Sequence, residues 1–139
     1  MKHTRARILY VDEHQNTRLM LMFLLQMDGF GVMTASNVAD ALRHARENKF
    51  DIYITEQLLP DGKGTELCQQ LREFDPKTPV LYYTSLAGDK HREEALTQCG
   101  DAYLDKPVCI ADFKETILRL LIERENDKIA SAANFADET

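Results

Sequence analysis

Short apolar segments alternate five times with segments of helical pattern along this chain of 139 residues. The apolar segments carry hydrophobic residues at consecutive positions, which is typical of parallel strands buried on both faces. This alternation predicts an α/β fold, a doubly wound five-stranded parallel sheet with helices on both faces. We expect strands at residues 7–11, 31–35, 51–55, 79–84 and 102–104. We expect helices at residues 17–27, 65–74, 89–99 and 110–125, and one more from a cap at Ser36 or Asn37 to about residue 47.

The composition indicates one folded domain, with 44% hydrophobic and 29% charged residues. The longest apolar run has seven residues, at 19–25, whereas a membrane span needs about 20. No apolar stretch typical of a signal peptide opens the sequence. The net charge of −6 comes without a basic face, which argues against a nucleic-acid partner. We therefore expect a cytoplasmic protein that binds neither membranes nor, through this domain, nucleic acid.

The three cysteines are Cys68, Cys99 and Cys109, and no two of them form a CxxC pair. A zinc site needs closer spacing and more ligands. An odd number of cysteines in a cytoplasmic protein favours free thiols. We expect all three to be reduced and packed.

Polar side chains follow four of the predicted strands. Asp12 and Glu13 follow the first strand, Glu56 the third, Thr84 ends the fourth, and Lys106 comes after the fifth. The carboxyl ends of parallel strands meet at one edge of a sheet, where α/β proteins place their ligands. Carboxylate oxygens suit Mg²⁺, and a lysine with a hydroxyl can neutralise a phosphoryl group. The sequence thus predicts a phosphoryl and metal site at this edge.

Several short segments follow one another at the spacing of a known family: ILYVDE at 8–13, DIYITE at 51–56, LP at 59–60, Gly64, PVL at 79–81, TS at 84–85, GDAYL at 100–104 and KP at 106–107. Through these segments the chain resembles the receiver domain of two-component response regulators over about residues 5–124. The resemblance implies a signalling domain rather than an enzyme, a flavodoxin-like strand order of 2-1-3-4-5, and a histidine kinase or downstream signalling protein as partner. Residues 125–139 would be a tail or a helical extension.

The resemblance also implies roles for single residues. Asp12 and Glu13 match the acidic pair that holds Mg²⁺. Thr84 matches the hydroxyl that reorients toward the phosphoryl group, and Lys106 matches the lysine that contacts it. Tyr103 matches the aromatic residue whose rotamer reports the state of the domain. The resemblance further predicts a cis peptide bond between Lys106 and Pro107.

One departure from the family pattern affects the chemistry. Glu56 stands where the family has its phosphoacceptor aspartate, and its extra methylene moves the carboxylate by roughly 1.3 Å. Because a misplacement of about 1 Å can cost around 10²-fold in rate, ordinary phosphorylation is not expected. Two interpretations of Glu56 remain open. Its carboxylate takes part of the place of a phosphoryl group and favours the active arrangement, or it pairs with Lys106 in an inert scaffold.

The same departure weakens the predicted metal site. We expect weak Mg²⁺ binding at Glu13, Glu56 and the backbone carbonyl of Leu58, with Asp12 acting through water, because Mg²⁺ demands near-octahedral geometry. One alternative is a working phospho-switch in which Glu56 or Asp61 accepts phosphate. Another is a small flavodoxin-like enzyme or cofactor-binding protein. That alternative needs a phosphate-cradling loop after the first strand, and residues 12–16 are acidic without glycine there.

The first and last predicted helices carry more apolar residues than one buried face requires. Met20, Leu21, Leu24 and Leu25 are expected to face the sheet, as are Phe113, Ile117, Leu120 and Leu121. The surplus predicts an exposed surface for a protein partner or a homodimer, unless the tail covers it through Phe135. This surface comprises Leu19, Met22, Phe23, Leu118 and Ile122.

Overall fold

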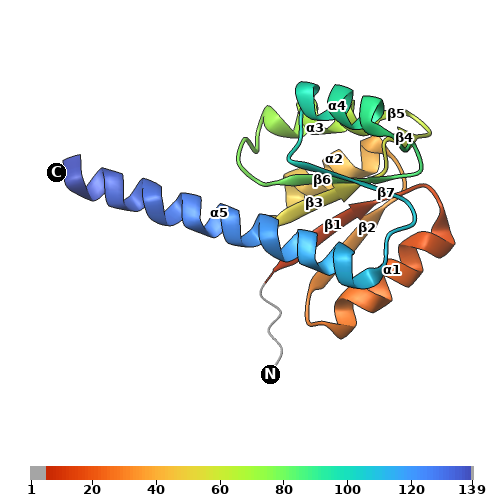
Figure 1. The fold of residues 1–139 in the computed structure, drawn as a ribbon, viewed down its shortest axis with the longest axis horizontal. Coiled ribbons are helices and arrows are strands. Elements are labelled where there is room, and N and C mark those ends of the chain that lie inside the picture. The colour runs from red at the N-terminus through yellow and green to blue at the C-terminus, as the bar shows by residue number, and fades with distance from the viewer. Residues whose placement is uncertain (1–5, 139) are drawn as a thin grey trace.

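The computed structural model describes residues 6–138 of the chain. Its centre is a five-stranded sheet in the order β2-β1-β3-β6-β7, and every neighbouring pair of strands is parallel (Figure 1). Counted along the chain, this is the predicted order 2-1-3-4-5, so the doubly wound fold is confirmed. The strands are β1 (Arg7–Val11), β2 (Gly31–Ala35), β3 (Ile52–Thr55), β6 (Val80–Thr84) and β7 (Ala102–Asp105).

Helices cover both faces of the sheet (Figure 1). Successive residues of a strand point to opposite faces. In β1, Ile8 and Tyr10 therefore enter the core beneath α1 and α5, while Leu9 and Val11 enter the core beneath the other three helices. The helices are α1 (Gln15–Met27), α2 (Val38–Glu47), α3 (Gly64–Arg72), α4 (Asp89–Gln98) and α5 (Ile110–Glu138).

A small hairpin that the sequence did not predict lies between β3 and α3. It pairs β4 (Leu58–Leu59) with β5 (Gly62–Lys63) in an antiparallel manner. Asp61 in its turn accepts hydrogen bonds from the backbone amides of Val38 at 2.7 Å and Ala39 at 3.1 Å, which fixes the hairpin to the start of α2. Asn37 caps the same helix, as one of the two predicted caps.

The last helix extends well past its predicted end at residue 125. It continues to Glu138 and projects away from the sheet (Figure 1), and the side chains at 125–133 are exposed. Residues 125–138 are therefore helical. Across residues 6–138, no helix combines the length and apolar character that crossing a membrane requires.

The prediction of reduced thiols is wrong for Cys68 and Cys99, and the prediction of packed side chains is wrong for Cys109. Cys68 in α3 and Cys99, which follows α4, form a disulfide with their Cα atoms 6.0 Å apart. Cys109 is a free, exposed thiol. The pair is separated by 31 residues in the chain, and its members become neighbours only because α3 and α4 pack on the same face of the sheet. Spacing along the sequence carries no sign of that contact.

Candidate functional site

The carboxyl edge of the sheet brings together four of the predicted site residues. Asp12 directly follows β1, Glu56 follows β3, Thr84 ends β6 and Lys106 follows β7. Asp12, Glu56 and Thr84 are buried, and Lys106 closes over them with 18% of its side chain exposed. The peptide bond between Lys106 and Pro107 is cis, as predicted. The four side chains therefore form one compact polar cluster, with Lys106 above the other three.

Glu56 uses one carboxylate oxygen to gather three donors. Its Oε1 accepts hydrogen bonds from the backbone amide of Gln57 at 2.8 Å and, less closely, from that of Leu58 at 3.4 Å. The hydroxyl of Thr84 donates to the same oxygen. These donors come from the start of the hairpin and from the end of β6. Glu56 thereby links two neighbouring strand ends.

The other oxygen of Glu56 faces the lysine. Its Oε2 lies 3.1 Å from Nζ of Lys106 and accepts a hydrogen bond from the backbone amide of Ser85 at 3.3 Å. Both oxygens of a carboxylate that is only 2% exposed are thus satisfied by the protein itself. A hydroxyl, a main-chain amide and an ammonium group are the donors that a bound phosphoryl group would need, and here they bind Glu56.

Asp12 is compensated in the same way. Its Oδ2 accepts hydrogen bonds from the hydroxyl of Tyr10 at 2.8 Å and from Nζ of Lys106 at 2.6 Å. Its Oδ1 accepts one from the backbone amide of His14 at 2.9 Å. Burial alone would raise the pKa of Asp12, but the bonds from Lys106, His14 and Tyr10 outweigh it and hold that pKa below its usual value. Asp12 is therefore a buried carboxylate stabilised in its charged form.

Lys106 carries the positive charge shared by the two acids. Burial alone would lower the pKa of Lys106, but the hydrogen bond from its ammonium group to Asp12 and the charges of Asp12 and Glu56 raise it. The ring of Tyr83 lies 5.4 Å from Nζ of Lys106 and adds a cation–π contact. Lys106 is thus held in its charged form between Asp12 and Glu56.

The residues do not fit a metal ion in this arrangement. Glu13 is exposed, while Asp12 and Glu56 face Lys106. Within residues 6–138, no three acidic, histidine or cysteine side chains are grouped so that they could hold a metal. Lys106 already supplies the positive charge that a cation would bring to Asp12 and Glu56. A bound Mg²⁺ would have to displace it.

Tyr103 is coupled to the cluster through the segment that follows β6. The backbone amide of Leu86 donates to the hydroxyl oxygen of Thr84 at 3.0 Å, and the hydroxyl of Tyr103 donates to the carbonyl of Leu86. Tyr103 is only 6% exposed, and its ring packs 5.7 Å from that of Tyr82. A continuous path of contacts therefore runs from Glu56 through Thr84 and Leu86 to Tyr103.

The family model of the response regulator receiver domain matches residues 8–134 of this chain. The chain belongs to the receiver domain family. Among curated relatives, the probable transcriptional regulatory protein TcrX of Mycobacterium tuberculosis is 32% identical over 113 residues, which cover 81% of this chain and 47% of TcrX. The chain thus spans about half the length of that relative.

Solved receiver structures have the same fold. A CheY-like receiver domain protein from Methanospirillum hungatei is 28% identical, with a TM-score of 0.83, and the match covers 88% of this chain and 98% of that one. The response regulator TrrA from Thermotoga maritima, solved in complex with Mg²⁺-BeF, is 27% identical with a TM-score of 0.75. That match covers 86% of this chain and 99% of TrrA.

Asp61, considered from the sequence as an alternative acceptor, binds the start of α2 instead. Its two carboxylate oxygens bind the amides of Val38 and Ala39 at the start of α2. Desolvation alone would raise the pKa of Asp61, but the hydrogen bonds from these two amides outweigh it and lower that pKa. Asp61 thus stabilises the hairpin and α2 in this arrangement.

The sequence does not predict the contacts of two residues that shape the receiver site, Tyr10 and Gln57. The hydroxyl of Tyr10 donates a hydrogen bond to Asp12. Gln57 accepts a hydrogen bond from the amide of Thr65 at 2.9 Å, which fixes α3 beside the cluster. A Cβ at Gly64 would lie 2.7 Å from the carbonyl oxygen of Glu56, so only glycine permits this approach. Gly64 is one of the positions on which the resemblance rests, whereas the contacts of Tyr10 and Gln57 depend on the folded sheet.

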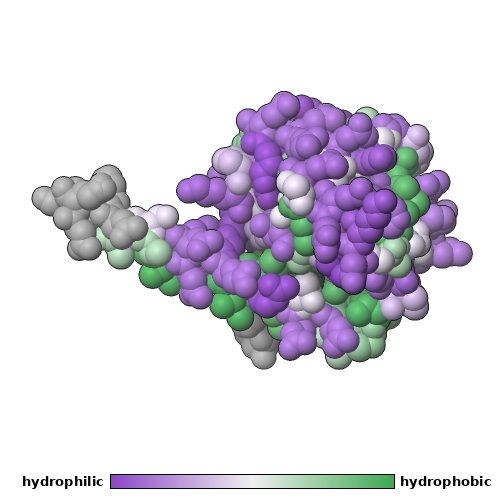
Figure 2. Space-filling model, turned by 45° about the horizontal axis from the view of Figure 1, so that its top comes forward, coloured by the Kyte–Doolittle hydropathy of each residue, from purple (hydrophilic) through white to green (hydrophobic). Residues whose placement is uncertain are grey.

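The predicted apolar surface is largely exposed. Leu19, Phe23, Leu118 and Ile122 are between 49% and 62% exposed, whereas Met22 is partly buried. Green apolar atoms interrupt the hydrophilic surface along α5 and below it in Figure 2.

The prediction that Met20 faces the sheet is wrong, because α1 turns Leu21 and Leu25 inward and leaves Met20 56% exposed. Phe135 lies outside the residues whose side chains the structure describes.

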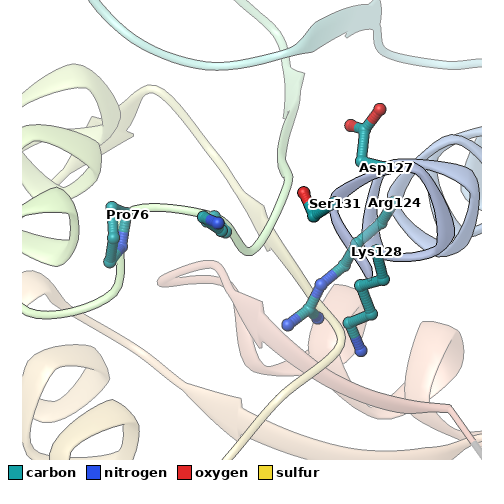
Figure 3. A pocket seen from close by; sticks show the side chains of 6 residues that line it. Pro76, Arg124, Asp127, Lys128 and Ser131 are labelled. Carbon is teal, nitrogen blue, oxygen red and sulfur yellow. The ribbon is translucent and has the colours of Figure 1, made fainter. Parts of the chain in front are cut away.

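A hollow of about 490 Å³ lies at the opposite edge of the sheet, between the α5 extension and the loop before β6 (Figure 3). Arg124 lines it and donates to the backbone carbonyls of Phe50 and Asp51 at 3.4 and 3.3 Å, which ties α5 to the start of β3. The other lining residues are Pro76, Lys77, Asp127, Lys128 and Ser131. The hollow is separate from the Glu56 cluster. The hydrogen bonds of Arg124 beside it fix the start of the extension to the sheet.

Proposed function

We propose that this receiver domain is not phosphorylated in the ordinary way and acts through contact with other proteins. The observation that carries the proposal is the state of Glu56, whose two buried oxygens accept bonds from Thr84, Ser85 and Lys106. An acceptor carboxylate must approach phosphorus in line with the leaving group, and that geometry tolerates little displacement. Glu56 also occupies the donors that would stabilise the transferred group.

The contacts of Glu56 favour the first of its two interpretations. An inert pair would need only Lys106, whereas here Thr84 has also turned its hydroxyl to Glu56 and Tyr103 is buried. The resemblance implies that these two side chains report the active arrangement. We therefore infer that Glu56 holds the domain in that arrangement without phosphate. The pairing with Lys106 is compatible with both interpretations. The positions of Thr84 and Tyr103 are what favour the active arrangement over the inert scaffold.

The partner follows from the family and from the exposed surface. A histidine kinase or a downstream signalling protein in the cytoplasm is the partner expected for a receiver domain. The exposed residues Leu19, Phe23, Leu118 and Ile122 on α1 and α5 support a contact surface there, for such a partner or for a homodimer. Weak Mg²⁺ binding remains part of the proposal, and it requires Lys106 to move away from Asp12.

Intact mass after incubation with acetyl phosphate and Mg²⁺ tests the proposal. The wild type should gain no adduct of about 80 Da, the mass that a phosphoryl group adds. The E56D variant should gain it, because the shorter side chain withdraws from Thr84 and Lys106 and leaves both free for the phosphoryl group. Phosphate on Glu56 or Asp61 of the wild type would establish the alternative of a working phospho-switch. An E56Q variant, which has the same length without the acid, serves as the matched unlabelled control.

A further inference from the structure

The two cysteines of the disulfide join the helices that flank the Glu56 cluster. Cys68 lies in the middle of α3, fully buried among the residues of that core. Cys99 follows the last residue of α4 and is only partly buried. The bond thus connects a buried position to one that solvent can reach. Of the two residues, Cys99 is therefore the one on the side from which a dissolved thiol would approach the bond.

Helix α4 has few apolar contacts with the core, although the hydroxyl of Tyr82 donates to the carbonyl of Cys99 at 2.7 Å. Ala95 is its only buried residue, and Leu96 is partly buried against the same core. The six residues at 89–94 are all charged or histidine, and they contribute no buried apolar side chain. Apolar burial is the main force that fixes a helix to a sheet. Because α4 buries so little apolar surface, its position depends strongly on the covalent link to α3.

Both helices also contact residues that adjoin the polar cluster. The amide of Gly64, the first residue of α3, donates to the carbonyl of Gln57 at 2.9 Å. Arg92 of α4 lies 3.4 Å from Asp105 and stacks 5.8 Å from the ring of Tyr103. The disulfide therefore stabilises two elements that pack against the two ends of the path from Glu56 to Tyr103.

We propose that Cys68 and Cys99 form a reversible redox site, oxidised by a small-molecule disulfide and reduced by a thiol, whose state sets how firmly α4 is held. In the cytoplasm, the location proposed above, disulfides are usually transient and redox-sensing rather than permanent. This input acts at α3 and α4, whereas the Glu56 carboxylate is bound by Thr84, Ser85 and Lys106. A receiver domain that is not phosphorylated would thereby still respond to the redox state of its surroundings.

The exchange balances with glutathione disulfide as the oxidant. The Cys99 thiolate attacks one sulfur of glutathione disulfide, forms a mixed disulfide and releases one glutathione thiolate. The Cys68 thiolate then attacks the Cys99 sulfur and releases the second glutathione. Two electrons pass from the protein to glutathione disulfide, and the two thiol protons end on the two glutathione molecules. Reduction by excess thiol is the reverse.

Hydrogen exchange of the full chain in both redox states tests the proposal. A C109S background removes the exposed third thiol, which would otherwise form mixed or intermolecular disulfides. The reduced protein, treated with glutathione disulfide, should lose about 2 Da and yield a Cys68–Cys99 peptide. On reduction, amides at 92–98 should exchange roughly tenfold faster or more, while those of β1 and β3 stay unchanged. The melting temperature should fall by about 10 °C.

A further variant separates the redox effect from damage to the core. C99S changes the partly exposed cysteine. With glutathione or with glutathione disulfide, its hydrogen exchange and melting temperature should match those of the reduced protein. The proposal is overturned if glutathione disulfide forms no bond between the two cysteines, or if α4 exchanges at the same rate in both states. Reduction of the unsubstituted pair gives the same comparison without any core substitution. Labelling of E56D by acetyl phosphate is independent of these outcomes, so the two proposals fail separately.

Discussion

The hydroxyl of Thr84 donates a hydrogen bond to Oε1 of Glu56, and both side chains are buried. Thr84 ends β6 and Glu56 follows β3, so the bond connects two neighbouring strands at the edge where the receiver family carries out its chemistry. The same hydroxyl oxygen accepts a hydrogen bond from the amide of Leu86, whose carbonyl binds Tyr103. One threonine thus relates the state of the acceptor position to the position of an aromatic side chain.

Replacing Thr84 with valine tests the importance of that bond. T84V keeps the shape of the side chain but leaves Oε1 of buried Glu56 with fewer donors, so the free energy of unfolding should fall by about 1–3 kcal/mol. T84S retains the hydroxyl and is the matched control. Urea denaturation would compare the three proteins. Equal stability of T84V and T84S would mean that the hydroxyl contributes nothing to Glu56.

Stability should depend on pH at both ends of the scale. The folded-state pKa of Asp12 is lowered, so its contribution is present above about pH 4, its ordinary pKa, and is lost as the pH falls through the folded pKa. The folded-state pKa of Lys106 is raised, so its contribution is present below about pH 10 and is lost as the pH rises through the folded value. Urea midpoints should therefore be highest between these limits.

The D12N variant is the control for the acidic limit. It removes the carboxylate whose protonation breaks the pair with Lys106, so its midpoint should fall less steeply below about pH 4 than that of the wild type. Parallel curves for the two proteins in acid would assign the loss of stability to other carboxylates.

Removal of Lys106 should strengthen Mg²⁺ binding. In the wild type, Nζ of Lys106 lies 2.6 Å from Asp12 and 3.1 Å from Glu56, where its charge opposes a second cation. Calorimetry should therefore detect only weak binding, whereas K106M should bind the ion more tightly, because two buried carboxylates are left without a counter-charge. K77M, at an exposed lysine outside the cluster, is the matched control. Micromolar affinity of the wild type would contradict the prediction.

The sheet could be predicted because buried parallel strands leave consecutive apolar residues in the sequence. The hairpin could not, because strands of two residues at Leu58 and Gly62 are too short to show a pattern. The far end of α5 could not be predicted, because the residues after 125 include several alanines but show no apolar pattern for packing. The disulfide and the contacts of Tyr10 arise only when distant segments meet.

Within the site, strand ends predicted which side chains meet but not how they bind. Asp12, Glu56, Thr84 and Lys106 converge as expected, since each follows or ends a neighbouring strand. The sequence could not show that Lys106 contacts both acids at once, because that depends on side-chain length and burial. The prediction for Met20 is wrong because the apolar residues of α1 surround much of the helix. Several rotations of α1 about its axis would bury a similar number of them, and only packing against the sheet decides which rotation is adopted.

The exposed residues of α1 and α5 predict self-association or a partner contact. Phe23 is 62% and Leu118 49% exposed, and full burial of such side chains is worth about 1.5–3 kcal/mol each. The double variant F23E/L118E should stay folded, because neither residue belongs to the core, yet it should sediment as a monomer at concentrations where the wild type self-associates. F74E, at an apolar residue 40% exposed after α3, is the matched control and should leave association unchanged. A wild type that sediments as a monomer at every concentration and binds no protein partner through this surface would refute the prediction.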